Sequence, residues 1–156
     1  MVATGRDAAD IVAVQQLAAH YAEAVSRLSV REAVEAYAAD GVLSTPTTAD
    51  VQGRDAIAEL IESTISGLDL VFQTIHLGVV RVDGDIARAR FPVTEWARRA
   101  ADGRGIQFLG WYDDIAVRTA EGWRFGHRRL IPRTLGHPGG LTAALHPIPG
   151  APFAGV

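Results

Sequence analysis

The residue whose type and position best suit acid–base chemistry is His76. It lies in the apolar run from Leu70 to Val82, which is expected to form a long, largely buried strand before Asp83-Gly84-Asp85 turns the chain in a hairpin. A buried imidazole needs a hydrogen-bond partner, and imidazole is the side chain that ionises nearest to neutral pH. His76 is therefore the first candidate for a general base or acid. The alternative is a core histidine bonded to a tyrosine or a carboxylate.

The expected third long strand, residues 106–119, carries side chains that can meet His76. Strand alternation puts Phe108, Tyr112 and Asp114 on one face. Either Tyr112 or Asp114 can hydrogen-bond an imidazole across the sheet, so Asp114 is assigned to catalysis, and Tyr112 and Phe108 to substrate binding. A carboxylate in mid-strand that is paired or placed at a rim is the alternative for Asp114.

Two further strands supply candidate binding residues. Glu95, in the expected strand over residues 86–99, continues the apolar face that carries Phe91, and an acid in that position predicts a place in a pocket wall. The alternative is that the strand leaves the core there. Arg129, in the expected strand over residues 123–133, shares a face with Phe125 by alternation and is predicted to bind an anionic or carbonyl oxygen of a substrate.

The first helix, expected over residues 8–28, carries Tyr21 and Ser26. Tyr21 lies on the apolar stripe of the helix, so its hydroxyl is expected to point toward the core or a cavity. Ser26 is expected either to line the mouth of the pocket or to cap the helix. Both residues are candidates for the site.

Three helices followed by a long meander of strands predict an α+β domain. The second helix is expected to begin after Ser29 and to end at Asp40-Gly41. The third is expected to follow Gln52-Gly53-Arg54-Asp55 and to stop at Gly67, and the simplest packing curls the sheet around the first helix. The strands are apolar on both faces, so one face is expected to hold the helices and a cavity. The other face needs a cover as well, which predicts a homodimer through the sheet. The domain is expected to span residues 1–133, followed by an irregular arm rich in Gly, Pro and Ala over residues 134–156.

Composition excludes several classes of function. The chain has 156 residues with a net charge of -3, which gives no reason to expect nucleic acid or an anionic membrane surface as a partner. There is no apolar run near the length of a transmembrane helix and no signal-peptide segment, so a cytoplasmic location is expected. There is no cysteine, no HxH or HExxH spacing and no glycine-rich phosphate loop. Neither a metal site nor a cofactor is therefore predicted.

The order of seven short motifs resembles the SnoaL-like family of the nuclear transport factor two-like superfamily. They are Tyr21-Ala22-Glu23-Ala24-Val25, Tyr37-Ala38-Ala39-Asp40-Gly41-Val42, Gly53-Arg54-Asp55-Ala56-Ile57, Ile75-His76-Leu77-Gly78, Val82-Asp83-Gly84-Asp85-Ile86-Ala87, Gly110-Trp111-Tyr112-Asp113-Asp114 and Gly122-Trp123-Arg124-Phe125. The resemblance implies a cone-shaped fold, in which a curved, mixed or antiparallel sheet wraps around three helices and encloses an apolar pocket. It covers residues 8 to about 133.

The resemblance also implies roles for individual residues. In scytalone dehydratase, bile-acid 7α-dehydratase and hexachlorocyclohexane dehydrochlorinase, a strand histidine is the general base, and His76 matches it. The aspartate that orients that histidine is replaced here by Ser26. By likeness to ketosteroid isomerase, Tyr21 falls on the oxyanion-hole tyrosine and Asp114 near the oxyanion-hole acid, while Thr45 stands where the general-base carboxylate would be.

These observations predict a cofactor-independent lyase, isomerase or cyclase. Its substrate would be a small hydrophobic ring metabolite of the polyketide, terpenoid or steroid-like kind. His76 would move the proton, and Tyr21, Tyr112 and Asp114 would bind the oxygen on which charge develops. Two alternatives stay open: a binding or accessory protein that holds a hydrophobic ligand without turning it over, and a purely structural dimeric partner. The fold alone does not choose among them.

Overall fold

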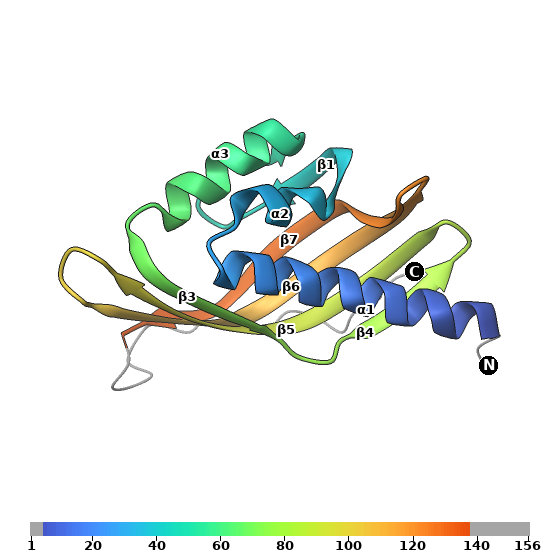
Figure 1. Cartoon of the computed structure of the whole chain (residues 1–156). Helices are drawn as coiled ribbons and strands as arrows, with labels where there is room; N and C mark the ends of the chain where they lie inside the picture. Colours follow the sequence, from blue (N-terminus) through green and yellow to red (C-terminus); the bar gives the residue numbers. More distant parts are fainter. Residues whose placement is uncertain (1–4, 138–156) are drawn as a thin grey trace.

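A single curved sheet with three helices on one face makes up the fold (Figure 1). The structure is a computed structural model that describes residues 5–137. The helices are α1 (Gly5–Ser26), α2 (Val30–Glu35) and α3 (Arg54–Ile65). The strands are β1 (Tyr37–Ser44), β2 (Val51–Gln52), β3 (Leu68–Ile75), β4 (Val79–Asp83), β5 (Ile86–Arg99), β6 (Gly105–Thr119) and β7 (Gly122–Gly136).

The sheet is mixed, in the order β2-β1-β7-β6-β5-β3, and β4 also pairs with β5. The pairing of β1 with β7 is parallel, and the other pairings are antiparallel. The long strands β5, β6 and β7 follow one another along the chain and lie side by side, so most of the sheet is a meander. The predicted α+β class and curved sheet under three helices are confirmed.

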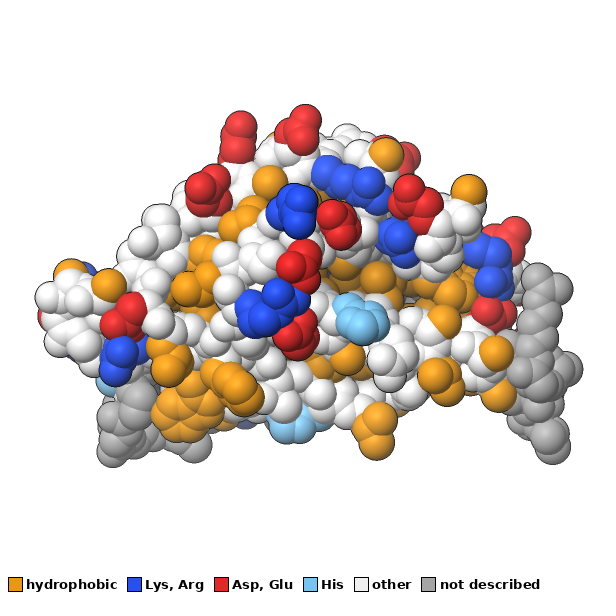
Figure 2. Space-filling view, viewed as in Figure 1, with side chains coloured by type: hydrophobic (Ala, Val, Ile, Leu, Met, Phe, Trp, Pro, Cys, Tyr) orange, Lys and Arg blue, Asp and Glu red, His pale blue; other side chains and the backbone are white. Residues whose placement is uncertain are grey.

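Helix α1 lies along the inner face of the sheet because one side of it is apolar (Figure 1). Val14, Ala18 and Tyr21 recur at helical spacing on that side, and all three are buried. They pack on inward side chains of the strands, such as Phe91 and Phe125, which are also buried. Charged side chains gather instead on the outer surface of the helices (Figure 2). The core therefore lies between the helices and the sheet.

The expected single strand from Leu70 to Val82 is two strands, because the chain departs from regular pairing between β3 and β4. Gly78 lies in this break and closely approaches β5. A Cβ atom at Gly78 would stand 2.3 Å from Cδ1 of Phe91 and 2.4 Å from the carbonyl oxygen of Arg90. The backbone nitrogen of His76 still donates to the carbonyl oxygen of Pro92 at 3.0 Å. Both strands thus stay on the same side of β5, with His76 at their junction.

Two further boundaries differ from expectation. Strand β1 already begins at Tyr37, because its start pairs with Phe125 of β7, so α2 is shorter than predicted. Strand β7 runs to Gly136, past the boundary predicted at residue 133, because it stays paired with β6 as far as Gln107. The rest of the predicted arm, residues 138–156, lies outside the described residues.

The face of the sheet opposite the helices carries exposed hydrophobic side chains. Phe72 and Trp96 stand opposite each other on β3 and β5 and are 61% and 41% exposed. Leu70, two positions before Phe72, is exposed as well. In Figure 2 hydrophobic side chains gather along the lower edge of the molecule, below the helices. The expectation that both faces of the sheet are apolar therefore holds for this part of it.

Candidate functional site

A cavity of about 130 Å³ lies between the helices and the inner face of the sheet. Most of its wall is apolar. The apolar lining residues are Val25, Leu43, Leu60, Ile61, Ile65, Leu68 and Leu130, and the polar ones are Tyr21, Thr45, Thr64, Gln73, Glu95 and Tyr112. This combination of an apolar wall and a few polar groups is typical of a site for a small organic molecule.

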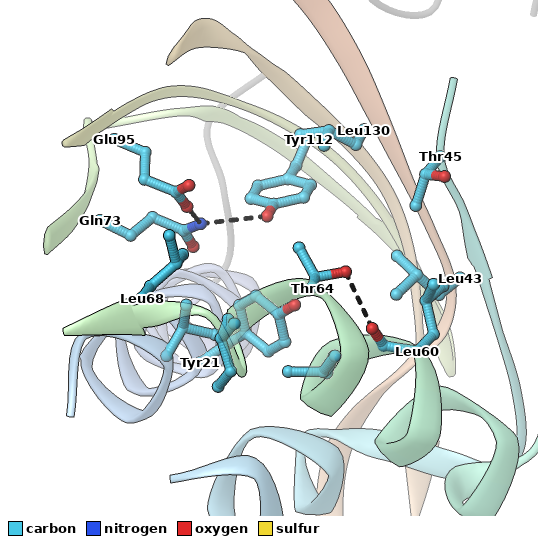
Figure 3. Close-up of a pocket in the computed structure, with 13 residues that line it drawn as sticks. Tyr21, Leu43, Thr45, Leu60, Thr64, Leu68, Gln73, Glu95, Tyr112 and Leu130 are labelled. Carbon is cyan, nitrogen blue, oxygen red and sulfur yellow. Dashed lines mark hydrogen bonds between the residues drawn. The ribbon is translucent and has the colours of Figure 1, made fainter. Parts of the chain in front are cut away.

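Three polar side chains form one end of the cavity (Figure 3). The amide nitrogen of Gln73 donates to Oε2 of Glu95 at 2.6 Å and to the hydroxyl of Tyr112 at 3.3 Å. The three residues lie on adjacent strands, because Gln73 pairs with Glu95 and Glu95 pairs with Phe108 of the strand that carries Tyr112. The hydroxyl of Tyr112 accepts the bond from Gln73 and also interacts with the hydroxyl of Tyr21. A hydroxyl that accepts one bond can still donate its proton, to Tyr21 or to a ligand oxygen.

Glu95 is the carboxylic acid of this wall. It is half-buried. Burial raises the pKa of Glu95, because the apolar surroundings penalise the charged form, while the hydrogen bond from Gln73 acts in the opposite direction. An acid placed in this way holds its proton to a higher pH than an exposed glutamate, which suits a group that both takes up and releases protons. The predicted place of Glu95 in a pocket wall agrees with the structure.

Tyr21 and Tyr112 bring phenol hydroxyls to the same cavity. Their ring centroids lie 6.0 Å apart in an edge-on arrangement, and both side chains are buried. Burial raises the pKa of both tyrosines, and the charge of Arg128 opposes that rise. Both hydroxyls therefore stay protonated at neutral pH and can donate hydrogen bonds. The expected orientation of Tyr21 toward a cavity agrees with the structure.

Behind the tyrosines lies a fully buried ion pair of Asp114 and Arg128. The guanidinium of Arg128 donates to Asp114 twice, from Nε to Oδ1 at 2.9 Å and from Nη2 to Oδ2 at 2.6 Å, and both side chains have zero exposure. Asp114 does not line the cavity. The prediction that it meets His76 or a substrate oxygen is wrong, because Arg128 occupies its carboxylate.

His76 lies on the other face of the sheet. Its side chain is exposed, and Nε2 lies 2.9 Å from the hydroxyl of Thr94. In β3 the inward residues are Val71 and Gln73, so alternation turns His76 outward. The prediction that His76 faces the pocket and meets Tyr112 or Asp114 is therefore wrong.

Two other predicted residues sit at or near the cavity. Thr45 lines it at the end of β1, where its hydroxyl lies 2.7 Å from that of Thr48. Ser26 does not line it. Its hydroxyl accepts a bond from the backbone nitrogen of Gln73 at 2.8 Å and donates to the carbonyl oxygen of Ala22 at 2.8 Å. Ser26 thus joins α1 to β3 beside Gln73, and the expected place at the pocket mouth is wrong.

The remaining predicted binding residues lie elsewhere. Phe91 is buried in the core beneath Gly78, and Phe108 packs against that core, so neither lines the cavity. Arg129 is exposed and stands opposite Asp113, whose side chain belongs to the outer face. Its predicted contact with a substrate in this cavity is wrong.

A bulge in β7 explains the error at Arg129. Ile115 of β6 pairs with His127, but Ala116 pairs with Phe125, so Gly126 is an extra residue without a partner. An extra residue reverses the alternation of everything that follows it. Arg128 rather than Arg129 therefore points inward.

Sequence reasoning missed Gln73 and Thr64 among the polar lining residues, and Arg128 behind the cavity. Gln73 lies on the same face as Val71, but both faces of this strand are apolar, so alternation does not mark it. No signal marks Arg128 either, since the bulge is not visible in the residue pattern. Among residues 5–137 no three side chains of the metal-binding types come together, and no described helix is long and apolar enough to cross a membrane.

Comparisons with known proteins place the chain in a family. The model of the SnoaL-like domain matches residues 6–129. Protein Rv2910c of Mycobacterium tuberculosis, an uncharacterized protein, is 27% identical over 121 residues, which are 76% of this chain and 82% of the relative.

Two solved structures illustrate the shared fold. The type 2 hexachlorocyclohexane dehydrochlorinase LinA superposes with a TM-score of 0.75 at 13% identity, over 90% of this chain and 94% of that one. A ketosteroid isomerase-like protein from Erwinia carotovora atroseptica superposes with a TM-score of 0.67 at 19% identity, over 84% and 98%. Because the family model matches most of its length, the chain belongs to the SnoaL-like domain family.

Proposed function

We propose that the protein is a cofactor-independent enzyme of the lyase, isomerase or cyclase type that acts on a small hydrophobic ring compound. The observation that carries this proposal is Glu95, a half-buried carboxylic acid with a raised pKa in the wall of an apolar cavity. Glu95 takes the role of proton carrier that the sequence suggested for His76. The names of two structural neighbours, a dehydrochlorinase and a ketosteroid isomerase-like protein, agree with this reaction class.

The reaction would begin when the carboxylate of Glu95 takes a proton from a carbon next to a carbonyl group. The electron pair of the broken C–H bond moves into the carbonyl and leaves negative charge on its oxygen. Tyr112 and Tyr21 can donate hydrogen bonds to that oxygen from the same cavity. The proton held by Glu95 then returns to another carbon, which gives isomerisation, or to a departing hydroxyl group, which gives dehydration.

The test is hydrogen–deuterium exchange at carbon, followed by NMR in D₂O with a panel of enolisable cyclic ketones. The protein is expected to accelerate exchange, and Glu95→Gln to reduce the rate by about 100-fold or more, the usual contribution of a general base. Glu59→Gln, at an exposed position of α3, and His76→Ala are the controls and should retain exchange. Undiminished exchange in Glu95→Gln would show that another group moves the proton.

A second candidate function is binding of a hydrophobic ligand without turnover. One observation favours it: among residues 5–137, Glu95 is the only carboxylic acid that lines the cavity, and no histidine lines it. A site with a single acid–base group suits a carrier as well as a one-base enzyme. Tight binding of a ring compound with no exchange at any of its carbons would select the carrier.

A further inference from the structure

The guanidinium of Arg128 lies against the rings of three aromatic residues. Its central carbon is 4.0 Å from the ring centroid of Tyr112, 4.5 Å from that of Tyr21 and 3.8 Å from that of Phe125. Two of these rings, Tyr21 and Tyr112, also line the cavity, whereas Arg128 does not. The cation is therefore one layer behind the cavity wall and touches the residues that form it.

The position of this charge is held firmly. Asp114 binds the guanidinium through two hydrogen bonds, and neither side chain has any exposure. A buried ion pair is seldom explained by stability, because hydrophobic residues of similar volume often stabilise a protein as well or better. Stability alone therefore does not explain why an arginine lies behind the two phenol rings, and a functional role at the cavity is the alternative.

A nearby cation changes what a phenol hydroxyl can do. It favours negative charge on the phenol oxygen, and it makes the hydroxyl a stronger hydrogen-bond donor to an anionic acceptor. Burial raises the pKa of both Tyr21 and Tyr112, and Arg128 works against that rise at both residues. The ionisable groups that interact with the cation are Tyr21 of α1, Tyr37 of β1, and Tyr112 and Asp114 of β6. Glu95 of β5 acts on both Tyr21 and Tyr112, and Asp113 and His127 act on Asp114.

We infer that Arg128 is a positioning residue that acts through Tyr21 and Tyr112, so that the cavity selects a ligand whose oxygen carries negative charge, such as a phenolate or an enolate. The inference rests on the proposed function, because it assigns the place where charge gathers after Glu95 has taken a proton. It adds the class of ligand: a compact ring with an ionised or ionising oxygen is bound in preference to a neutral ring of the same shape.

The test uses 4-nitrophenol, which ionises near neutral pH and changes its absorbance when it does, and nitrobenzene as its neutral counterpart. In the unaltered protein, bound 4-nitrophenol is expected to ionise at a lower pH than the free compound. If it ionises at a higher pH, or if neither compound binds, the inference is overturned without any variant.

Variants then locate the effect. Arg128→Met with Asp114→Leu removes both charges while keeping volume in the core. This double variant is expected to lose affinity for 4-nitrophenolate by about tenfold or more, which equals one unit of pKa, and to bind nitrobenzene within about twofold of the original. Arg128→Lys keeps the charge and should retain most of the preference. An equal loss for both compounds would mean that Arg128 only supports packing.

The matched control is the outer-face pair of Arg90 and Asp113. Asp113 precedes Asp114 on β6, and its Oδ2 lies 2.7 Å from Nη2 of Arg90. Arg90→Met with Asp113→Leu should leave the preference unchanged.

A spectroscopic readout is also at hand, because the chain has three tyrosines and all of them lie in this cluster. Their ionisation, followed by absorbance, should shift to higher pH in Arg128→Met with Asp114→Leu and not in the control. An unchanged tyrosine titration would count against the inference.

Failure of this inference and failure of the proposed function are distinguishable. Glu95→Gln should reduce carbon exchange by about 100-fold or more, as above, but keep the preference for 4-nitrophenolate, since it removes a negative charge from the cavity. A preference that survives with no exchange in any protein would leave Arg128 its role and remove the enzyme. Carbon exchange without a preference for 4-nitrophenolate would support the enzyme and remove the role of Arg128.

Discussion

Gln73 and Glu95 stand opposite each other on β3 and β5, and the amide nitrogen of Gln73 lies 2.6 Å from a carboxylate oxygen of Glu95. This bond joins the acid to Gln73, the only side-chain amide among the described residues that line the cavity. It favours the ionised form of an acid whose pKa burial raises. Gln73 therefore sets how readily Glu95 accepts a proton.

Replacing Gln73 by leucine should raise the pKa of Glu95 further, because the hydrogen bond that lowers it is lost while burial remains. The measurement is a ¹³C NMR titration of the carboxyl group of Glu95. Gln107→Leu, on the outer side of β6 opposite Trp96, is the control and should leave that titration unchanged. A Glu95 pKa that falls in Gln73→Leu would mean that water enters the cavity and replaces the amide.

The stability of the protein should depend on pH through Glu95. Burial raises the pKa of Glu95 in the folded state above its ordinary value of 4.5, so the folded protein binds this proton more tightly than the unfolded chain. The resulting stabilisation is complete below pH 4.5 and is lost as pH rises through the folded pKa. Glu95→Gln should therefore gain stability relative to the original protein as pH rises above 4.5.

Urea unfolding at a series of pH values measures this difference. Glu59→Gln removes an exposed carboxylate and serves as the control, because its side chain does not touch the cavity. Parallel pH curves for Glu95→Gln and the original protein would contradict a raised pKa.

Gly78→Ala should destabilise the protein by about 1 to 3 kcal/mol, the usual effect of overpacking. The new Cβ atom would stand 2.3 Å from the ring of Phe91 and 2.4 Å from a backbone oxygen, and backbone gives way less easily than a side chain. Gly67→Ala, where nothing lies within 4 Å, is the control and should change stability by less than about 0.5 kcal/mol. Thermal unfolding of the two variants gives the comparison, and equal melting temperatures would mean that the break between β3 and β4 moves freely.

We propose that the outer face of the sheet joins two copies of the chain around Phe72 and Trp96. An exposed pair of large aromatic side chains is the kind of patch that interfaces bury. Phe72→Glu should weaken self-association by at least about tenfold, as loss of a central aromatic contact does. Val12→Glu, at an exposed position of α1, should not. Sedimentation velocity over a range of concentrations decides the matter, and a monomer at every concentration would refute the dimer.

Regular alternation made part of the site predictable from sequence. Strands β5 and β6 pair without a register shift around the cavity, so the two-residue period of a strand was enough to place Glu95 and Tyr112 on the side of the pocket. The helical stripe of α1 placed Tyr21 in the same way. Sequence reasoning found these three residues because each continues the apolar face of its own strand or helix.

Alternation failed where both faces of a strand are apolar. From Val71 to His76, one face carries Val71 and Ile75, and the other carries Phe72 and His76, so hydrophobicity does not say which face is inward. The packing of α1 on the sheet decides it, and that contact is long-range. His76 was assigned to the wrong face for this reason.

The bulge at Gly126 has a consequence for folding. Without the extra residue, β7 would pair with β6 in a register shifted by one residue beyond this point. In the register without the bulge, Arg129 would enter the core and Leu130 would face water. The ion pair of Asp114 and Arg128 forms only in the observed register. It therefore stabilises the correct pairing of β7 with β6 over the shifted one.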